Sequence, residues 1–275
     1  MILKELNFDD AVKLSKQLKI FSYFASPFYL YYNCLLEEKG GETLVYEKQK
    51  IDNKYPLFCL PKSDNFDNQI VATGFDEDIK HIEKTHTILN KKVIGYEYFY
   101  STDDWIDLKG SSFKSIRKEI NHFQKEHNFK ILDKYPKKKI IEFINNWAEE
   151  KRKKEAKQLT KSLFEQELKE SIENIKILET YGHKAIFLEE DGKLLSFSIF
   201  IHLFDNCWVA LTQKTIHGLQ GLPQFLHHLK SKVMGPGQIF ATGAEAQDPN
   251  LKAFKESLRP CNVKPIYVIK IGNKK

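Results

Sequence analysis

Cysteine is scarce in this sequence, and this scarcity excludes two classes of protein. The four residues, Cys34, Cys59, Cys207 and Cys261, are scattered over 275 positions. None of them forms a CxxC pair, and none has a histidine partner at the spacing of a zinc site. A disulfide framework and a metal centre are therefore not indicated, and reduced thiols in the core are the simpler interpretation.

Long hydrophobic runs are also missing. A membrane-spanning helix needs ~20 mainly apolar residues. The most apolar segment, Phe21 to Leu36, is shorter and contains several polar residues, and Leu194 to Leu211 alternates as strands do. The start, Met1 to Leu6, lacks the basic and then apolar pattern of a secretory signal. We expect a soluble, cytoplasmic protein with no transmembrane segment.

The residues that are present suit a globular protein with an uneven charge. Hydrophobic residues make up 41%, and the net charge is only +6. The segment Lys109 to Lys161, however, holds 16 Lys or Arg and 7 Asp or Glu. A polyanion such as tRNA, or an anionic lipid headgroup, fits such a region. The alternative is a pair of solvated helices whose charges pair on neighbouring turns.

The hydrophobic pattern predicts an α/β protein. The first part is expected to hold a helix at Asp9 to Leu18 with Asn7 as its cap, short strands at Thr43 to Tyr46, Lys54 to Leu60 and Ile70 to Ala72, a helix at Asp76 to Leu89 and a strand at Val93 to Tyr100. From Asp104 to Tyr181 amphipathic helices are expected, interrupted by a short strand and turn at Phe129 to Pro136.

The last hundred residues carry the clearest pattern. It predicts strands at Lys184 to Leu188, Leu194 to Phe204 and Cys207 to Thr212, a glycine-containing loop, a helix at Pro223 to Val233, a strand at Gln238 to Thr242, a helix at Pro249 to Leu258 and a strand at Val263 to Ile271. This order resembles the acyltransferase fold of the GNAT superfamily, in which a mixed twisted sheet has helices on its faces.

Two local motifs narrow the resemblance. The first is the strand end Tyr98-Phe99-Tyr100, followed by Leu108-Lys109-Gly110 and then by Arg117 and Phe123. The second runs from Gly243 to Asp248 and continues to Leu251, Lys255 and Pro260. Together they resemble the family of the C-terminal domain of phosphatidylglycerol lysyltransferases, including its soluble stand-alone members. The resemblance implies two GNAT-like halves, as in the Fem transferases, at 1–130 and 131–275, with the active site expected in the second.

The same resemblance implies a function. It points to aminoacyl transfer from aminoacyl-tRNA to an amine or hydroxyl acceptor on a small molecule, a lipid headgroup or a peptide, with no tightly bound cofactor. The tRNA would lie on the basic region 109–161. Two alternatives stay open: a coenzyme A-dependent N-acetyltransferase or N-acyltransferase that uses acetyl-CoA or acyl-CoA, and a non-catalytic nucleic-acid-binding relative.

A first group of candidate residues follows the predicted strand Cys207 to Thr212. Gly218 and Gly221 precede a helix, and the free N–H groups of a helix start can bind a phosphate or an oxyanion. Gln213 and Lys214 lie beside this loop, and together the segment loosely matches the coenzyme A loop of GNAT enzymes. A glycine pair of this kind is also a common entry turn for a helix.

A second group of candidate residues lies near the C-terminus, and one further candidate, Arg117, lies in the basic region. Glu245 is a candidate base or ligand of an α-ammonium group, and so is Asp248, whose alternative role is to cap the helix at Pro249. Lys255 would stabilise an oxyanion or hold a phosphate, and Arg117 would clamp a phosphate or carboxylate. For both cations the alternative is an ordinary surface position. His217 is a weaker candidate base.

Overall fold

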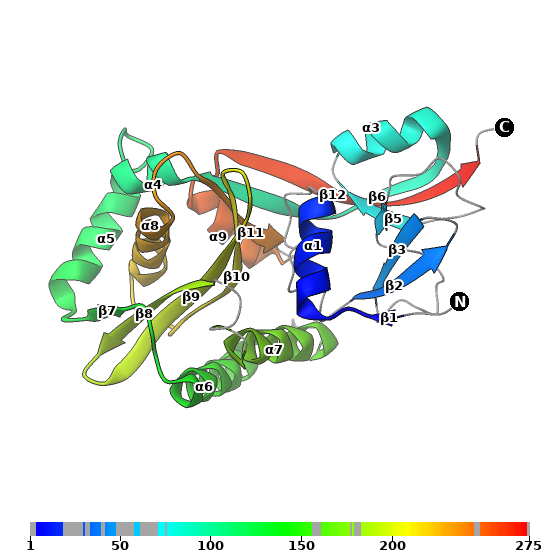
Figure 1. Cartoon of the computed structure of the whole chain (residues 1–275). Helices are drawn as coiled ribbons and strands as arrows, with labels where there is room; N and C mark the ends of the chain where they lie inside the picture. Colours follow the sequence, from blue (N-terminus) through cyan, green and yellow to red (C-terminus); the bar gives the residue numbers. More distant parts are fainter. Residues whose placement is uncertain are drawn as a thin grey trace. The chain divides into compact units, whose positions relative to one another are not determined.

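The computed structural model describes residues 4–18, 30, 34–39, 42–47, 58–60, 71–74, 76–155, 161–176, 178, 183–244 and 248–273 (Figure 1). The chain divides into two compact units, one made of Met1–Phe99 with Ala241–Lys275 and the other of Tyr100–Phe240. This division differs from the expected halves 1–130 and 131–275. The reason is that the C-terminal strand pairs with strands of the N-terminal part, so that both ends of the chain belong to one unit.

The first unit is mainly antiparallel sheet. The strands β1 (Lys4–Glu5), β2 (Cys34–Lys39), β3 (Glu42–Glu47) and β4 (Phe58–Leu60) pair in that order. A long strand, β12 (Asn262–Asn273), lies between β5 (Val71–Gly74) and β6 (His86–Ser101) and is antiparallel to both. The unit also holds α1 (Phe8–Leu18), α3 (Asp76–Thr85) and α9 (Pro249–Ser257), and β11 (Ile239–Ala244) leads into it.

The start of α1 and the end of α3 each have a physical explanation. The Asn7 side chain accepts a hydrogen bond from the Asp10 amide at 2.9 Å, so Asn7 is the predicted cap of α1. The helix expected at Asp76 to Leu89 ends at Thr85 instead, and His86 already belongs to β6. The pairing of Thr87 with Gly272 and of Ile88 with Ile271 shows why: ladder hydrogen bonds to β12 replace the last helical turn.

The second unit contains the predicted meander. β7 (Lys130–Leu132), β8 (Lys184–Glu190), β9 (Lys193–Phe204) and β10 (Cys207–Thr215) are antiparallel neighbours in that order. The helix α8 (Leu222–Met234) packs on this sheet together with α4 (Thr102–Asp107) and α5 (Lys114–Glu126), while α6 (Lys137–Glu155) and α7 (Lys161–Lys176) pack together against β9 and β10 (Figure 1). Among the described helices, none is long and apolar enough to cross a membrane.

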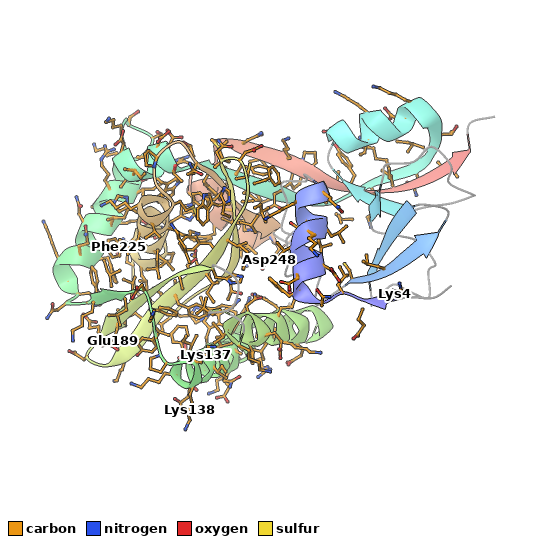
Figure 2. All side chains as sticks on the ribbon, in the orientation of Figure 1. Lys4, Lys137, Lys138, Glu189, Phe225 and Asp248 are labelled. Carbon is orange, nitrogen blue, oxygen red and sulfur yellow. The ribbon has the colours of Figure 1, made fainter. Side chains whose placement is uncertain are left out.

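Aromatic side chains form much of the core of this unit. Every residue of β9 from Leu194 to Ile201 is buried. Figure 2 labels Phe225, which belongs to α8. Its ring centroid lies 5.5 Å from that of Phe123 on α5 and 4.9 Å from that of Phe129. Each fully buried side chain of this size contributes about 1.5–3 kcal/mol to folding. These contacts hold α5 and α8 together and thereby fix the start of α8.

The cysteines only partly meet the expectation of core thiols. Cys34 is a buried free thiol, and Cys207 is half-buried. Cys261 is exposed, so the prediction is wrong for this residue, which precedes β12 and hydrogen-bonds the Phe99 carbonyl. The side chain of Cys59 lies outside the described residues.

Candidate functional site

The loop between β10 and α8 has the form that the sequence predicted. Gly221 is the N-cap of α8 with φ of 81°, and it offers no side chain to the first turn of the helix. The helix begins with Leu222 and Pro223 and closes its first turn through the Phe225 amide, which donates to the Gly221 carbonyl at 2.8 Å. The Leu222 amide donates to the Leu219 carbonyl at 3.4 Å and Pro223 has no N–H, so an anion would be favoured here mainly by the positive end of the helix dipole.

The two glycines of the loop serve different purposes. A Cβ on Gly221 would clash with the main-chain carbonyl of Glu119 and lie 3.2 Å from the Cβ of Phe123, both on α5. Gly218 has φ of 91° but open space around it. Gly221 is therefore needed for the close approach of α8 to α5, whereas Gly218 is needed only for its backbone conformation.

Gln213 and Lys214 are neighbours in sequence but contact different helices. The Gln213 Oε1 accepts a hydrogen bond at 2.9 Å from the Nζ of Lys230, a fully buried lysine on α8. The Lys214 Nζ donates to the Oε1 of Glu167 on α7. Successive residues of a strand point to opposite faces of the sheet, which accounts for this separation. The two predicted ligand residues therefore do not form one pair.

The Lys214 ammonium also reaches an aromatic cluster that was missed in the sequence. Its Nζ lies 4.3 Å from the ring centroid of Trp147 on α6, and the Nζ of Lys151 lies 5.2 Å from the same centroid. The ring of His217 is nearly parallel to that of Trp147, with an interplanar angle of 14° and 6.5 Å between centroids. The available signal was Lys151 four residues after Trp147, which places both on one helix face.

Arg117 on α5 holds the preceding loop. Its Nη1 donates to the carbonyl of Leu108 and, at 3.0 Å, to that of Gly110. Leu108 is a non-glycine residue in the left-handed region, with φ of 51°. The guanidinium therefore stabilises the connection between α4 and α5, a role that the two candidate interpretations of this arginine did not include.

The exposed side of α5 carries positive charge. A shallow surface hollow is lined by Arg117 and by further residues of the same helix, none of them acidic: Lys114, Lys118, Asn121, His122 and Lys125. The three lysines are exposed. This part of the predicted basic region is thus a continuous cationic face, hereafter the α5 basic face, on which a polyanion would be favoured.

Asp248 and Lys255 lie in the first unit, on and beside α9. Asp248 is the N-cap of α9, and its Oδ1 accepts from the amides of Asn250 at 2.8 Å and Leu251 at 3.2 Å (Figure 2). The capping alternative is therefore the geometry observed for Asp248. Glu245 lies outside the described residues.

Lys255 is buried, with 6% of its surface exposed. Its Nζ donates to the carbonyls of Thr242, at 3.1 Å, and Gly243, and lies 5.5 Å from the ring centroid of Tyr98. The surface alternative is therefore wrong for this residue. The ammonium fixes the end of β11 immediately before the segment that holds Glu245.

The buried histidines of α8 belong to the core. The His228 Nδ1 donates to the Trp105 carbonyl at 2.6 Å, and burial is the main reason that the pKa of His228 is lowered. His227 packs among the rings of Tyr100, Trp105 and Phe240, at centroid distances of 4.6, 4.2 and 4.8 Å. Neither imidazole is placed as an accessible base.

The meander, the loop, α8, β11, α9 and β12 follow one another in the order of a GNAT-like α/β acyltransferase fold. The chain belongs to the family described as phosphatidylglycerol lysyltransferase, C-terminal, whose model matches residues 63–228, more than half of the sequence. Membership of this family and the GNAT-like fold together support the interpretation of this protein as an acyltransferase. Among curated protein sequences, none matches the chain significantly.

Solved structures share the fold over nearly the whole chain. A conserved protein of unknown function from Bacteroides thetaiotaomicron VPI-5482 is 13% identical with a TM-score of 0.77, covering 99% of this chain and 100% of that one. The L-PGS from Bacillus licheniformis is 12% identical with a TM-score of 0.58, covering 100% and 95%. FemX is 8% identical with a TM-score of 0.58, covering 98% and 97%. At these identities the likeness shows the fold.

Proposed function

We propose that this protein transfers an aminoacyl group from aminoacyl-tRNA to an amine or hydroxyl acceptor. Membership of the phosphatidylglycerol lysyltransferase C-terminal family is the observation that carries the proposal. The α5 basic face supports it, because a row of exposed lysines on one helix suits the phosphate backbone of an RNA donor.

The proposed reaction is an acyl substitution at the ester carbonyl of the donor. Glu245 accepts the proton of the acceptor N–H or O–H as the nucleophile attacks the carbonyl carbon. The tetrahedral intermediate then collapses: the bond between the carbonyl carbon and the ribose oxygen breaks, and that oxygen takes up the proton that Glu245 had accepted. The products are an amide or ester on the acceptor and uncharged tRNA.

The described residues act around this step by binding and positioning. The positive end of the α8 dipole, with Gly218 and Gly221 shaping the loop before it, favours a phosphate of the donor or the developing oxyanion. Lys255 holds the end of β11, the strand that precedes Glu245 in the sequence. Asp248 starts α9, which carries Lys255.

Three further residues support the donor side. Lys230 orients Gln213 on β10, and Lys214 places a cation between α6, α7 and β10. Arg117 hydrogen-bonds the loop that precedes α5 and thereby positions the N-terminal end of the α5 basic face.

Acyl transfer from acetyl-CoA or acyl-CoA is the second candidate, because a pyrophosphate fits the same helix start. Thermal-shift measurements separate the two donors. We expect total aminoacyl-tRNA to raise the melting temperature at low salt, and acetyl-CoA at micromolar concentration to leave it unchanged. Stabilisation by acetyl-CoA without a response to tRNA would contradict the aminoacyl-tRNA proposal and favour the second candidate.

A further inference from the structure

Lys230 on α8 is a fully buried lysine whose ammonium fixes the orientation of one side-chain amide. Its Nζ donates to the Oε1 of Gln213 on β10 at 2.9 Å and lies 5.0 Å from the ring centroid of Phe240. A lysine ammonium has three donors and no acceptor, so it bonds only the oxygen of an amide. The Oε1 of Gln213 therefore faces Lys230, and the Nε2 of the same planar amide is directed away from it.

The Nε2 of Gln213 is a donor that the protein does not use. No oxygen in the described part of the chain accepts a hydrogen bond from this nitrogen, and it is not enclosed, since Gln213 is only half-buried. Ser198, directly opposite Gln213 on β9, is fully buried, and its Oγ likewise has no partner among the described residues. Opposite residues of an antiparallel pair lie on the same face of a sheet. This face therefore offers two unused polar groups, one of them open to solvent.

The bond from Lys230 makes the Gln213 amide a better donor. A charged group that bonds the oxygen of an amide polarises it, so that the N–H bonds on the other side of the amide carry more positive charge. The same bond holds the amide in one orientation before a ligand arrives. An N–H that is oriented and polarised in advance suits an oxygen on which negative charge develops, as it does on the carbonyl oxygen in acyl transfer.

We propose that the Nε2 of Gln213 donates a hydrogen bond to the carbonyl oxygen of the acyl group during transfer, and that Lys230 is the positioning residue that holds Gln213 in this role. The inference rests on the proposed function, because it requires an acyl transfer. It holds for either donor, since an aminoacyl ester and an acyl thioester both have a carbonyl oxygen that becomes negatively charged in the tetrahedral intermediate.

Gln213→Glu separates this role from a purely structural one. Glutamate keeps an oxygen for the Lys230 ammonium and nearly the same shape, but it replaces the Nε2 donor with a carboxylate oxygen. We expect stability equal to or above that of the wild type, with kcat lowered about 100-fold and KM changed less than about twofold. The matched control is Gln238→Glu, because Gln238 is also half-buried and its Oε1 accepts from the Trp208 Nε1 at 3.0 Å. This control should keep the kcat of the wild type.

Lys230→Met tests the positioning part of the inference. Methionine leaves the Gln213 amide free to rotate, and we expect kcat to fall about tenfold. Adding Gln213→Glu to Lys230→Met should lower kcat less than it does in the wild type, because both changes act on one hydrogen bond. The side-chain NH₂ signal of Gln213 in ¹⁵N spectra, identified by its loss in Gln213→Glu, should shift in Lys230→Met. An unshifted signal would contradict the positioning role without any activity measurement.

A folded Gln213→Glu variant with the kcat of the wild type would overturn the inference and leave the proposed function standing. An equal fall of kcat in Gln238→Glu would also overturn it, because any added charge would then suffice. Should Gln213→Glu not fold, Gln213→Met, which lacks the donor and is uncharged, is judged by the same change in kcat. Transfer from acetyl-CoA instead of aminoacyl-tRNA, still lowered by Gln213→Glu, would contradict only the proposed donor. Absence of transfer from both donors would contradict the proposed function and this inference together.

Discussion

The ammonium of Lys255 donates a hydrogen bond to the main-chain carbonyl of Gly243, two residues before Glu245. A second bond goes to the carbonyl of Thr242 at 3.1 Å. A lysine side chain that is buried against the end of a strand is costly unless its charge is compensated, and here the two carbonyls compensate it. Lys255 therefore ties α9 to the end of β11, which precedes the proposed base in the sequence.

Replacing Lys255 with methionine should reduce both stability and transfer. The two carbonyls lose their donor, which we expect to lower the free energy of unfolding by about 1–3 kcal/mol. Transfer should fall by more than unfolding alone explains, because the end of β11, which precedes Glu245 in the sequence, loses its bonds to α9. The matched control is Lys252→Met on the same helix, where the side chain is 46% exposed and its ammonium pairs with Glu256. Equal transfer rates of the two folded variants would contradict the positioning role.

Asp248 offers a test that separates capping from catalysis. Asparagine is as good an N-cap as aspartate, so Asp248→Asn should keep the stability of α9, while Asp248→Ala should lower it by ~1 kcal/mol. Chemical denaturation measures both. If Asp248 acts only as the cap, Asp248→Asn also keeps full transfer activity. A stable Asp248→Asn variant without activity would assign the carboxylate to the chemistry instead.

The two loop glycines should respond very differently to alanine. Gly221→Ala brings a Cβ against the Glu119 carbonyl and must separate α8 from α5, so we expect a loss of several kcal/mol or no folded protein. Gly218→Ala meets open space and should cost only about 1 kcal/mol for its positive φ. Thermal unfolding compares the two. Similar losses for both variants would show that the close packing of Gly221 is not what requires glycine.

The α5 basic face should govern the salt dependence of RNA binding. Each of Lys118→Ala and Lys125→Ala should reduce the slope of log affinity against log salt concentration by about 1. The control is Lys193→Ala, which removes an exposed lysine at the start of β9 in the same unit. Filter binding with total tRNA at several salt concentrations gives the slopes. Slopes that stay the same in both α5 variants would exclude this face as the RNA contact.

Acidification should destabilise the second unit through His183. Burial lowers the pKa of His183 from 6.5 to about 4, because the charged imidazolium is poorly solvated in the fold. Between these pH values the unfolded chain binds a proton that the folded chain does not, so stability falls as the pH drops from about 6.5 to about 4. The loss is at most about 3 kcal/mol.

His183→Gln removes the titrating group and should flatten this part of the stability profile. Part of the slope will remain, since the pKa of His228 is lowered for the same reason. Denaturant midpoints at pH 7 and pH 5 measure the effect. An unchanged difference between the two midpoints in the variant would show that His183 is not its source.

Local patterns in the sequence were sufficient to predict most of the strands and helices of the second unit. The alternation from Lys184 to Thr212 predicted the meander, because hairpin strands pair with their neighbours in sequence. The pairing of β12 with β5 and β6 joins residues almost two hundred positions apart, and no local pattern contains it. For that reason the units differ from the expected halves.

The sequence predicted those parts of the candidate site that depend on a turn or on a helix cap. The Gly218–Gly221 loop and the cap at Asp248 are set by residues within a few positions of each other. The partners of Lys214, Lys255 and Arg117 were not predictable, because each depends on which element packs nearby. Trp147 was read as one more apolar residue of its helix, since its neighbour His217 is 70 positions away in the sequence.

Transfer of a labelled amino acid tests the proposed function most directly. Total tRNA charged with radiolabelled amino acids is incubated with the protein and with acceptors of each class: small amines, peptides and anionic lipid vesicles. The account predicts label on one acceptor class, abolished by ribonuclease treatment of the donor and strongly reduced by Glu245→Gln. Label that appears only from acetyl-CoA, or that is unaffected by Glu245→Gln and Lys255→Met together, would contradict it.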